Sequence, residues 1–354
     1  MTDSPDHAPQ FPLTGLGWRP FFEQQLSPED RDGLVPVRVT TVHRNGLHVL
    51  GPGVDTTLLP YSDPAGGDEA SATVGDWLLF DPASPHAERL LQRQSLFKRR
   101  APGSGRDVQL IAANVDTIFI VTSCNQDFNI ARLERYLTIA REAQVTPVLI
   151  ITKSDLTDDP DDYARQAQGI DRSLCIEVLN ATDPGAVARL RPWCGAGQTI
   201  AFVGSSGVGK STLINSLTGK THIATQGIRD DDAKGRHTTT ARELHQLENG
   251  AWLLDTPGMR ELQLVDVKEG LAAVFGDLTD IAASCRFADC AHDTEPGCAI
   301  NAAIEDGTIN GDRVQRWLKL LTEEARNAES LAQRRAKDRA FGKMIKTMKK
   351  ELRD

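Results

Sequence analysis

One stretch of the chain has the residue types and spacing of a phosphate-binding loop. It fits the pattern G-x-x-x-x-G-K-[ST], with a strand-like apolar run before it at 199–203 and a helix-like run after it at 211–217. Glycine lets the backbone turn its N–H groups toward phosphate oxygens, the lysine reaches the β- and γ-phosphates, and the Ser211 hydroxyl binds Mg²⁺. We expect a nucleotide site at Gly204, Ser205, Ser206, Gly207, Val208, Gly209, Lys210, Ser211 and Thr212.

A second motif, Asp-Thr-Pro-Gly at 255–258, follows an apolar strand-like run. In a nucleotide hydrolase, Asp255 can hold Mg²⁺ through water, and the N–H of Gly258 can contact the γ-phosphate. An ordinary strand-to-turn junction would also produce this pattern. Its place after the phosphate loop favours the catalytic interpretation.

A third motif predicts which base is bound. Thr152-Lys153-Ser154-Asp155 ends a buried apolar run and resembles the [NT]-K-x-D element of GTPases. The Asp155 carboxylate can accept hydrogen bonds from N1–H and the 2-amino group of guanine, a donor pair that adenine lacks. Asn180 and Ala181 end the next strand-like run, where GTPases place a loop whose backbone touches guanine O6. We therefore expect GTP and GDP as ligands.

The order of these motifs is unusual, because the base-recognition element precedes the phosphate loop. This order reflects either chance or a circular permutation, which can preserve a site because domain termini often lie close together.

The segment between the second motif and the phosphate loop occupies the place of switch I. It contains Gly-Arg-His-Thr-Thr-Thr, and we expect Thr239 or Thr240 to complete the Mg²⁺ shell when a γ-phosphate is present. Met259 stands where Ras-like GTPases carry the glutamine that orients the attacking water, and methionine cannot do that. His237 is the nearest candidate catalytic residue, although a polar loop residue is an equally good interpretation.

Three cysteines and a histidine lie close together in the sequence. Cys₃His is a closed structural zinc set with no open position for catalysis, and the alternative is small buried cysteines near a loop histidine. The candidate zinc ligands are Cys285, Cys290, His292 and Cys298.

Composition limits the remaining possibilities. With 354 residues the chain should form two or three domains, and its net charge of −9 means that nucleic acid would have to contact local basic patches. No apolar run approaches the roughly 20 residues of a membrane span, and the first ten residues lack an apolar signal core. We expect a cytoplasmic monomer with no membrane partner.

The pattern along the chain predicts several domains. We expect a flexible N-terminal arm at 1–33, which Leu16, Trp18, Phe21 and Phe22 could pin to a folded body. Short strands and the hairpin signal Asn45-Gly46 then indicate a small barrel at 34–106. Such barrels often bind oligonucleotides, but the fold alone does not decide this. The basic segment 89–106 is either an RNA contact or a solvated linker.

Alternating strands and helices follow at 107–265 and imply a mostly parallel sheet. A helical region with the cysteines occupies 266–330, where Asp312 is the expected cap of a helix with Val314, Trp317, Leu318 and Leu321 on one face. A tail rich in lysine and arginine occupies 331–354.

Together, these motifs resemble the circularly permuted GTPases of the RsgA (YjeQ/YloQ) family, the small-ribosomal-subunit-dependent GTPases of bacteria. The resemblance covers about residues 34 to 330 and rests on the motif order, the Gly-Arg-His-Thr-Thr-Thr segment, the Cys-x₄-Cys-x-His-x₅-Cys site and the barrel. One departure is Thr152, where the family more commonly has asparagine. The asparagine side chain makes a hydrogen bond that braces the loop, and the sequence does not show whether threonine replaces that bond. The arm and the tail are further departures.

The resemblance implies a multidomain chain with an N-terminal OB-fold β-barrel, a central circularly permuted α/β P-loop GTPase domain and a C-terminal helical zinc-binding domain. It implies GTP hydrolysis stimulated by the small (30S) ribosomal subunit, a role in late assembly of that subunit through rRNA binding, and GTP/GDP, Mg²⁺ and one structural Zn²⁺ as cofactors. Two alternatives remain open: an RNA-binding assembly chaperone whose hydrolysis is incidental, and a metabolic P-loop ATPase that does not depend on Asp155.

Overall fold

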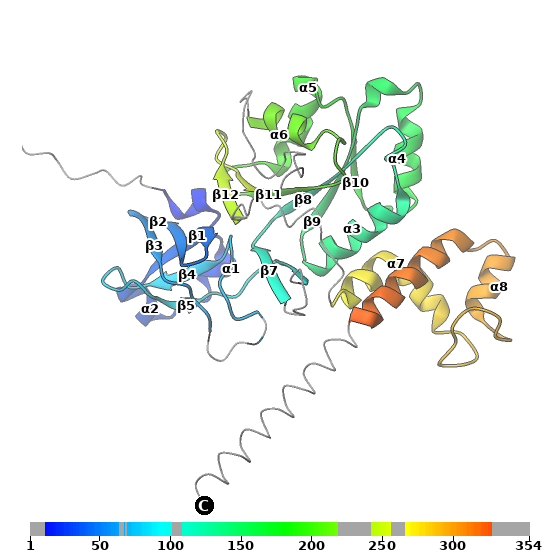
Figure 1. Ribbon diagram of the computed structural model, residues 1–354, viewed down its shortest axis with the longest axis horizontal. Coiled ribbons are helices and arrows are strands. Elements are labelled where there is room, and N and C mark those ends of the chain that lie inside the picture. The colour runs from blue at the N-terminus through cyan, green and yellow to red at the C-terminus, as the bar shows by residue number, and fades with distance from the viewer. Residues whose placement is uncertain are drawn as a thin grey trace, which may run out of the picture. The chain divides into compact units, whose positions relative to one another are not determined.

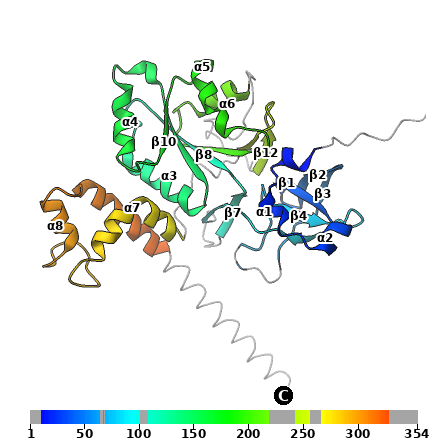
Figure 2. The same ribbon diagram turned by 180° about the vertical axis from the view of Figure 1, so that it is seen from behind.

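The computed structural model describes residues 11–63, 67, 69–100, 108–218, 242–255 and 266–327. The chain divides into two compact units, Met1–Arg99 with Val108–Leu262, and Arg100–Asp107 with Gln263–Asp354. Figures 1 and 2 show the elements of both units from opposite sides.

The first unit is built around a parallel sheet in the order β10-β9-β8-β11-β13, with β12 antiparallel to β13. β8 is buried along its whole length, as expected for a strand covered on both faces. β8 and β9 precede β11 in the chain and lie on one side of it, whereas β13 follows and lies on the other. The strands are β8 Thr117–Ser123, β9 Thr146–Thr152, β10 Cys175–Val178, β11 Thr199–Val203, β12 Arg242–Gln246 and β13 Trp252–Asp255.

Helices cover this sheet, with α5 and α6 on one side and α3 and α4 on the other (Figures 1 and 2). Side-chain caps fix where two of them begin: Asn129 accepts the N–H of Arg132 in α3, and Asp159 accepts that of Asp162 in α4. The helices are α3 Ile130–Glu142, α4 Pro160–Gln168, α5 Pro184–Val187 and α6 Lys210–Thr218, with the 3₁₀ turns η2 Ser154–Leu156 and η3 Ala188–Trp193.

Five strands from the earlier part of the chain pair antiparallel with one another in the spatial order β3-β2-β1-β4-β5. The predicted hairpin is present, but its two-residue turn is Arg44-Asn45, because His43 pairs with Gly46. Gly46 lies in the strand after the turn, where a Cβ would approach Cγ2 of Thr57 to 2.7 Å and the Leu58 carbonyl oxygen to 3.0 Å, so glycine favours close packing of β2 against β3. The strands are β1 Val35–His43, β2 Gly46–Gly51, β3 Val54–Leu58, β4 Trp77–Phe80 and β5 Ala87–Leu90.

The described part of the N-terminal arm forms three short helices, where the sequence suggested a flexible segment held by a few apolar side chains. Leu16 and Phe22 are buried, and the rings of Trp18 and Trp77 meet edge to face with centroids 4.8 Å apart. The arm is therefore packed against β4. Its helices are η1 Leu13–Leu16, α1 Pro20–Glu23 and α2 Pro28–Gly33.

Strands β1 to β5 continue into the central sheet. β1 pairs with β12, Thr41 opposite Glu243 and Val42 opposite Arg242, so that nine strands form one hydrogen-bonded path from β10 to β3, from which β4 and β5 branch at β1. The buried Arg38 of β1 donates to the Leu16 carbonyl and to Oγ1 of Thr199, both at 2.6 Å. Arg38 thus ties the arm and β1 to the start of β11.

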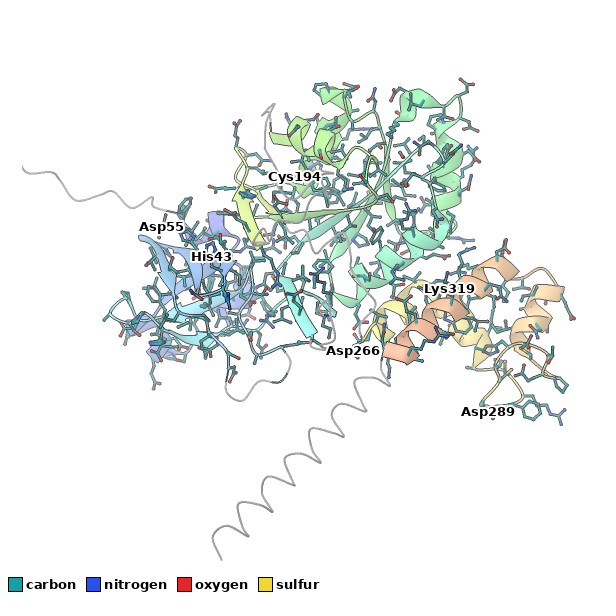
Figure 3. All side chains as sticks on the ribbon, viewed as in Figure 1. His43, Asp55, Cys194, Asp266, Asp289 and Lys319 are labelled. Atoms are coloured by element: carbon teal, nitrogen blue, oxygen red, sulfur yellow. The ribbon has the colours of Figure 1, made fainter. Side chains whose placement is uncertain are left out.

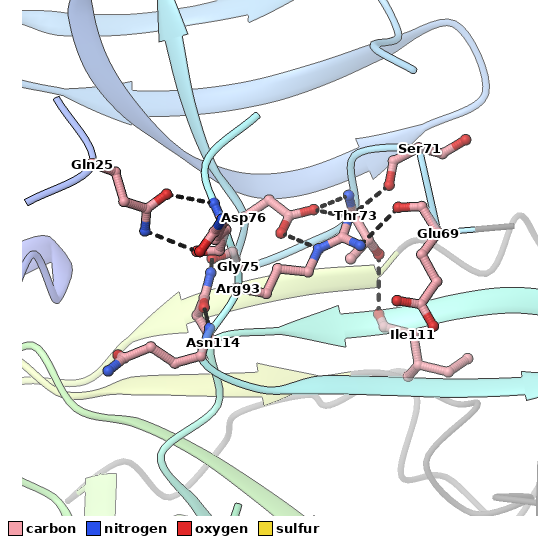
Figure 4. A network of polar contacts seen from close by, with 11 residues as sticks. Gln25, Glu69, Ser71, Thr73, Gly75, Asp76, Arg93, Ile111 and Asn114 are labelled. Carbon is pink, nitrogen blue, oxygen red and sulfur yellow. Dashed lines mark hydrogen bonds and ion pairs between the residues drawn. The ribbon is translucent and has the colours of Figure 1, made fainter. Parts of the chain in front are cut away.

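Several described cations of the basic segment 89–106 have polar partners within the chain, which neither of the two sequence-based interpretations predicted. Strands β6 Leu96–Arg100 and β7 Val108–Ala113 pair with each other here. Arg93 is almost buried and binds the carboxylate of Asp76 with two of its nitrogens, each at 2.8 Å (Figure 4). Ion pairs or hydrogen bonds also join Arg89 to Asp30, Lys98 to Glu69 and Arg99 to Gln109.

The second unit contains three helices in its described part: α7 Lys268–Ala282, α8 Ala299–Glu305 and a helix at 311–327. The side chain of Asn310, rather than the predicted Asp312, caps the last of these, accepting the N–H of Arg313 at 3.3 Å. Its buried face carries Leu320 with Val314 and Trp317, whereas the predicted Leu318 and Leu321 are only half-buried. None of the helices described in either unit is long and apolar enough to cross a membrane.

Candidate functional site

The phosphate loop lies between the end of β11 and the start of α6, as predicted. Gly204, Gly207 and Gly209 have φ values of 141°, 77° and 98°, a region that favours glycine. Gly204 also has no room for a side chain, because a Cβ would lie 2.1 Å from the carbonyl oxygen of Val121 in β8. The loop can therefore wrap closely around a phosphate group only with glycine at these positions.

The side chains of the loop are placed as a nucleotide site requires. Lys210 is 7% exposed, and its Nζ donates to the carbonyl of Gly204 at 2.9 Å and to that of Ser205. Ser206, Gly207 and Ser211 are exposed. The N–H groups that begin α6 and the Lys210 ammonium supply the positive field that an anion needs.

Thr152 connects the base-recognition element to this loop. Its buried hydroxyl lies 2.5 Å from the carbonyl oxygen of Val208 and 3.0 Å from that of Thr122. Lys153, the next residue, has a left-handed backbone with φ 58°. Threonine in place of asparagine therefore still ties the two loops, 56 residues apart in the chain.

Asp155 and the loop at 180–181 lie at the same edge of the sheet. Asp155 is exposed in η2. Burial raises the pKa of the Cys124 thiol, and the negative charge of Asp155 raises it further, so Asp155 lies near Cys124, the residue after β8. The Ser216 hydroxyl of α6 donates to the Ala181 carbonyl at 3.0 Å, and the Asn180 side chain accepts the N–H of Thr182. The base half and the phosphate half of the site are thus joined twice, through Thr152 and through Ser216.

Asp255 ends β13, beside the end of β11. The register pairs Ala201 with Leu254, so Asp255 follows at the edge from which the phosphate loop leaves. Its carboxylate is half-buried, and Nε2 of His245 lies 3.9 Å from Oδ2. A Mg²⁺ ion bound to Ser211 would lie in this region of the sheet edge, where an acid can hold its water ligands.

The four predicted zinc ligands come together in the second unit. Their ligand atoms all lie within 4.8 Å of one another, with Nδ1 of His292 3.5 Å from Sγ of Cys285 and 3.6 Å from Sγ of Cys298, and the two sulfurs 4.0 Å apart. Tetrahedral zinc, with bonds of about 2.3 Å to sulfur and 2.0 Å to nitrogen, separates sulfur from nitrogen by about 3.5 Å and sulfur from sulfur by about 3.8 Å. The separations of Cys285, His292 and Cys298 come close to these values, and all four donors lie near enough to one another to bind a single such ion.

The surroundings of Cys285 favour its thiolate and those of His292 hold the ring, whereas burial and the neighbouring cysteines raise the pKa of Cys290 to about 11. Burial tends to raise the pKa of the Cys285 thiol, but the N–H groups of Ala299 and Ile300 outweigh it and lower that pKa. The His292 ring stacks on Trp317, with centroids 5.8 Å apart. Asp289 belongs to the loop between the first two cysteines, and its side chain points away from the helices (Figure 3).

Comparisons with known proteins identify the family. A sequence profile of the RsgA GTPase family matches residues 90–265. The chain is 48% identical over 337 residues to a small ribosomal subunit biogenesis GTPase, RsgA 2 of Vibrio vulnificus, and the match covers 95% of each protein. The chain belongs to the RsgA GTPase family. The RsgA of Mesorhizobium japonicum is 50% identical over 318 residues, which cover 89% of this chain and 90% of that protein.

Solved structures agree with this membership. YjeQ from Thermotoga maritima is 25% identical with a TM-score of 0.57, covering 82% of this chain and 98% of that protein. YloQ, described as a circularly permuted GTPase, has the same fold, with 23% identity, a TM-score of 0.56 and coverage of 84% of this chain and 97% of its own. The permutation predicted from the motif order in this RsgA-family chain is confirmed.

Several predicted site residues lie outside the described residues. They are the switch candidates Thr239 and Thr240, the catalytic candidate His237, Gly258 of the Asp-Thr-Pro-Gly motif, and Met259. Their assignments remain predictions.

The structure adds one residue to this RsgA-family site that the sequence did not indicate. Arg132, on the first turn of α3, donates to the side-chain oxygen of Ser205 in the phosphate loop. No motif marks it, because the two residues are 73 positions apart and meet only through the order of β8 and β11 in the sheet.

Proposed function

We propose that this RsgA-family GTPase hydrolyses GTP to GDP and phosphate in the biogenesis of the small ribosomal subunit, and that this subunit stimulates hydrolysis. The GTPase activity follows from family membership, and the named relatives carry the ribosomal role in their names. We add to this the proposals that hydrolysis depends on the subunit and that the protein contacts rRNA. A ribosomal partner would place the protein in the cytoplasm.

The observation that carries the GTPase proposal is the tie between the two loops of the site. A phosphate loop alone indicates some nucleotide, and a Thr-Lys-Ser-Asp tetrapeptide alone is a weak signal. The Thr152 hydroxyl, 2.5 Å from the Val208 carbonyl, makes the two loops parts of one site. That arrangement supports a guanine nucleotide with its base at Asp155 and its phosphates at Lys210.

Each residue of the site has a role in this proposal. Lys210 and the loop N–H groups would hold the β- and γ-phosphates, Ser211 and Asp255 would hold Mg²⁺, and Asp155 would select guanine. Bound Mg²⁺ would neutralise charge that develops on the phosphate oxygens. In hydrolysis a water attacks the γ-phosphorus, the bond to the β,γ-bridging oxygen breaks, and the water's proton leaves with the products, GDP and phosphate.

Met259 is the reason to propose a partner for this step. Methionine offers no hydrogen bond to the attacking water, so the chain alone should hydrolyse GTP slowly. We propose that contact with the small subunit completes the site, with Thr239 or Thr240 closing the Mg²⁺ shell and His237 as the candidate that positions water.

We also propose that strands β1 to β5 form an OB-fold barrel that contacts rRNA. β1 pairs with both β2 and β4, β4 pairs with β5, and the Leu59 N–H donates to the Pro85 carbonyl between the ends of β3 and β5. This order supports a barrel closed through β3 and β5. Because several cations at 89–99 have partners within the chain, we assign a larger share of the phosphate contacts to the tail 331–354.

We propose one structural zinc ion at Cys285, Cys290, His292 and Cys298. The ligand separations and the lowered pKa of Cys285 support this assignment. With four protein ligands, the ion would have no open position and would stabilise the second unit rather than take part in hydrolysis.

The test measures GTP turnover with and without purified small ribosomal subunits, together with ATP turnover under the same conditions. Stimulated turnover of GTP alone is expected. Lys210→Ala should abolish turnover and also prolong residence on the subunit. Normal release of Lys210→Ala from the subunit would contradict a role for hydrolysis and favour an RNA-binding chaperone.

A further inference from the structure

Arg132 makes a polar link between helix α3 and the phosphate loop. Its Nη1 donates to Oγ of Ser205, the second residue of the loop, and lies 2.9 Å from Oδ1 of Asp127. All three residues belong to the first unit. The guanidinium therefore joins the end of β8, the start of α3 and the loop that follows β11.

Asp127 is itself fixed to the end of β8. Its N–H donates to Oδ1 of Asn125 at 2.9 Å, and the same oxygen accepts the hydroxyl of Ser123 at 2.8 Å. Oδ2 of Asp127 is buried and has no hydrogen-bond partner among the residues that the structure describes. Asp127 is therefore a rigid anchor, whose negative charge holds the guanidinium of Arg132 against the loop.

The phosphate loop is the part of the site that such an anchor would help most. It contains three glycines in left-handed or otherwise glycine-specific conformations, and Ser206 and Gly207 are exposed at its tip. Glycine-rich segments lose more conformational entropy than others when a ligand orders them. A bond that restrains Ser205 before binding reduces this cost and improves affinity through preorganisation.

We propose that Arg132 is a positioning residue for nucleotide binding, which acts through the Ser205 side chain to hold the phosphate loop in its binding conformation. The inference rests on the proposed binding of GTP and GDP at this loop. Because Asp127 largely neutralises the guanidinium, its effect is on the loop and is equal for both nucleotides. A cation that contacted the γ-phosphate directly would favour GTP over GDP.

The experiment measures dissociation constants of fluorescent GDP and GTP analogues for wild type, Arg132→Ala, Ser205→Ala and the double variant. Thermal unfolding is measured on the same samples. Arg141→Ala is the matched control, because Arg141 lies in the same helix and pairs with Asp171 at 2.9 Å, away from the loop. Subunit-stimulated GTP turnover gives KM and kcat for each protein.

Loss of one hydrogen bond to a charged group should weaken both nucleotides about tenfold in Arg132→Ala. The effect should disappear in the Ser205→Ala background, and KM should rise with kcat unchanged. Arg141→Ala should bind like wild type. A merely structural role would lower thermal stability without this dependence on Ser205.

Three results would overturn the inference. These are unchanged affinity in Arg132→Ala, losses that simply add in the double variant, and a loss confined to GTP with a fall in kcat, which would make Arg132 a γ-phosphate ligand. Failure of wild type to bind either nucleotide would instead refute the proposed function.

Discussion

The bidentate pair of Arg93 and Asp76 leads to a sharp prediction about stability. Arg93→Met keeps much of the side-chain length and removes the charge. It leaves the Asp76 carboxylate, which is 0% exposed, with the Thr73 N–H at 2.7 Å as its remaining hydrogen bond among those described (Figure 4). Arg93 also donates to the carbonyls of Glu69 and Ser71, both at 2.8 Å, so the variant releases the loop before β4 as well.

The magnitude follows from the burial of the pair. Removing one partner of a buried, hydrogen-bonded ion pair costs about 3–5 kcal/mol, because the other charge is left without compensation. Burial already raises the pKa of Asp76, and loss of Arg93 should raise it further. An acid with a raised pKa in the folded state contributes less stability as pH increases above its ordinary value of about 4. The variant should therefore lose more stability at pH 8 than at pH 5.

Urea unfolding followed by tryptophan fluorescence measures this loss of stability. Trp77, the first residue of β4, directly follows Asp76 and reports on its surroundings. Asp76→Asn in the Arg93→Met background should recover part of the stability, since it removes the uncompensated charge. Arg165→Met is the control, because Arg165 and its partner Asp159 are both 62% exposed, and it should leave the unfolding midpoint unchanged. A loss in Arg93→Met below about 1 kcal/mol, or one independent of pH, would refute the reasoning.

Three further predictions concern the two sites. Thr152→Val removes the hydroxyl that ties the loops and should weaken GTP and GDP binding by about 1–2 kcal/mol in calorimetry; unchanged affinity would show that the tie is not needed. Asp155→Asn should shift turnover from GTP toward xanthosine triphosphate, and a retained preference for GTP would place the base elsewhere. Metal analysis should find one zinc per chain in wild type and none in Cys285→Ser. The second unit of this variant should unfold at a lower temperature, seen as a change in the fluorescence of Trp317, while GTP still binds. A stable, metal-free wild type would count against the zinc site.

Much of the nucleotide site could be predicted because its signals are local. The runs that became β9 and β11 are largely apolar, as strands of a covered parallel sheet are, and the base-recognition element and the phosphate loop follow directly at their carboxyl ends. Parallel strands bring those ends to one edge, so a circular permutation could preserve the site, and the resemblance to the RsgA family favoured permutation over chance as the explanation of the motif order.

Long-range polar contacts could not be predicted in the same way. Arg89, Arg93 and Lys98 looked like a basic strip, but their acidic partners lie 59, 17 and 29 residues away in the sequence. Arg132 and Ser205 are likewise brought together only by the fold. No periodicity or motif encodes such pairs, because they depend on strand order and on where each loop leaves the sheet.

Two local signals predicted the right element, although the residue that carried the signal does not play the role it was assigned. Asn45-Gly46 predicted a hairpin, yet Gly46 lies outside the two-residue turn, in a strand position that packs closely against Thr57 of β3. Asp312 predicted the start of the last helix, but Asn310, two residues earlier, provides the cap. Both polar residues suit a helix N-terminus, and only the backbone path decides between them.

The central claim is that this RsgA-family site needs its ribosomal partner, because Met259 cannot orient the attacking water. The most direct test is the initial rate of phosphate release from GTP with purified small subunits added at increasing concentration. We predict slow release by the protein alone and a saturable increase with small subunits, but not with large subunits or with ATP. Equal rates with and without small subunits would contradict the account.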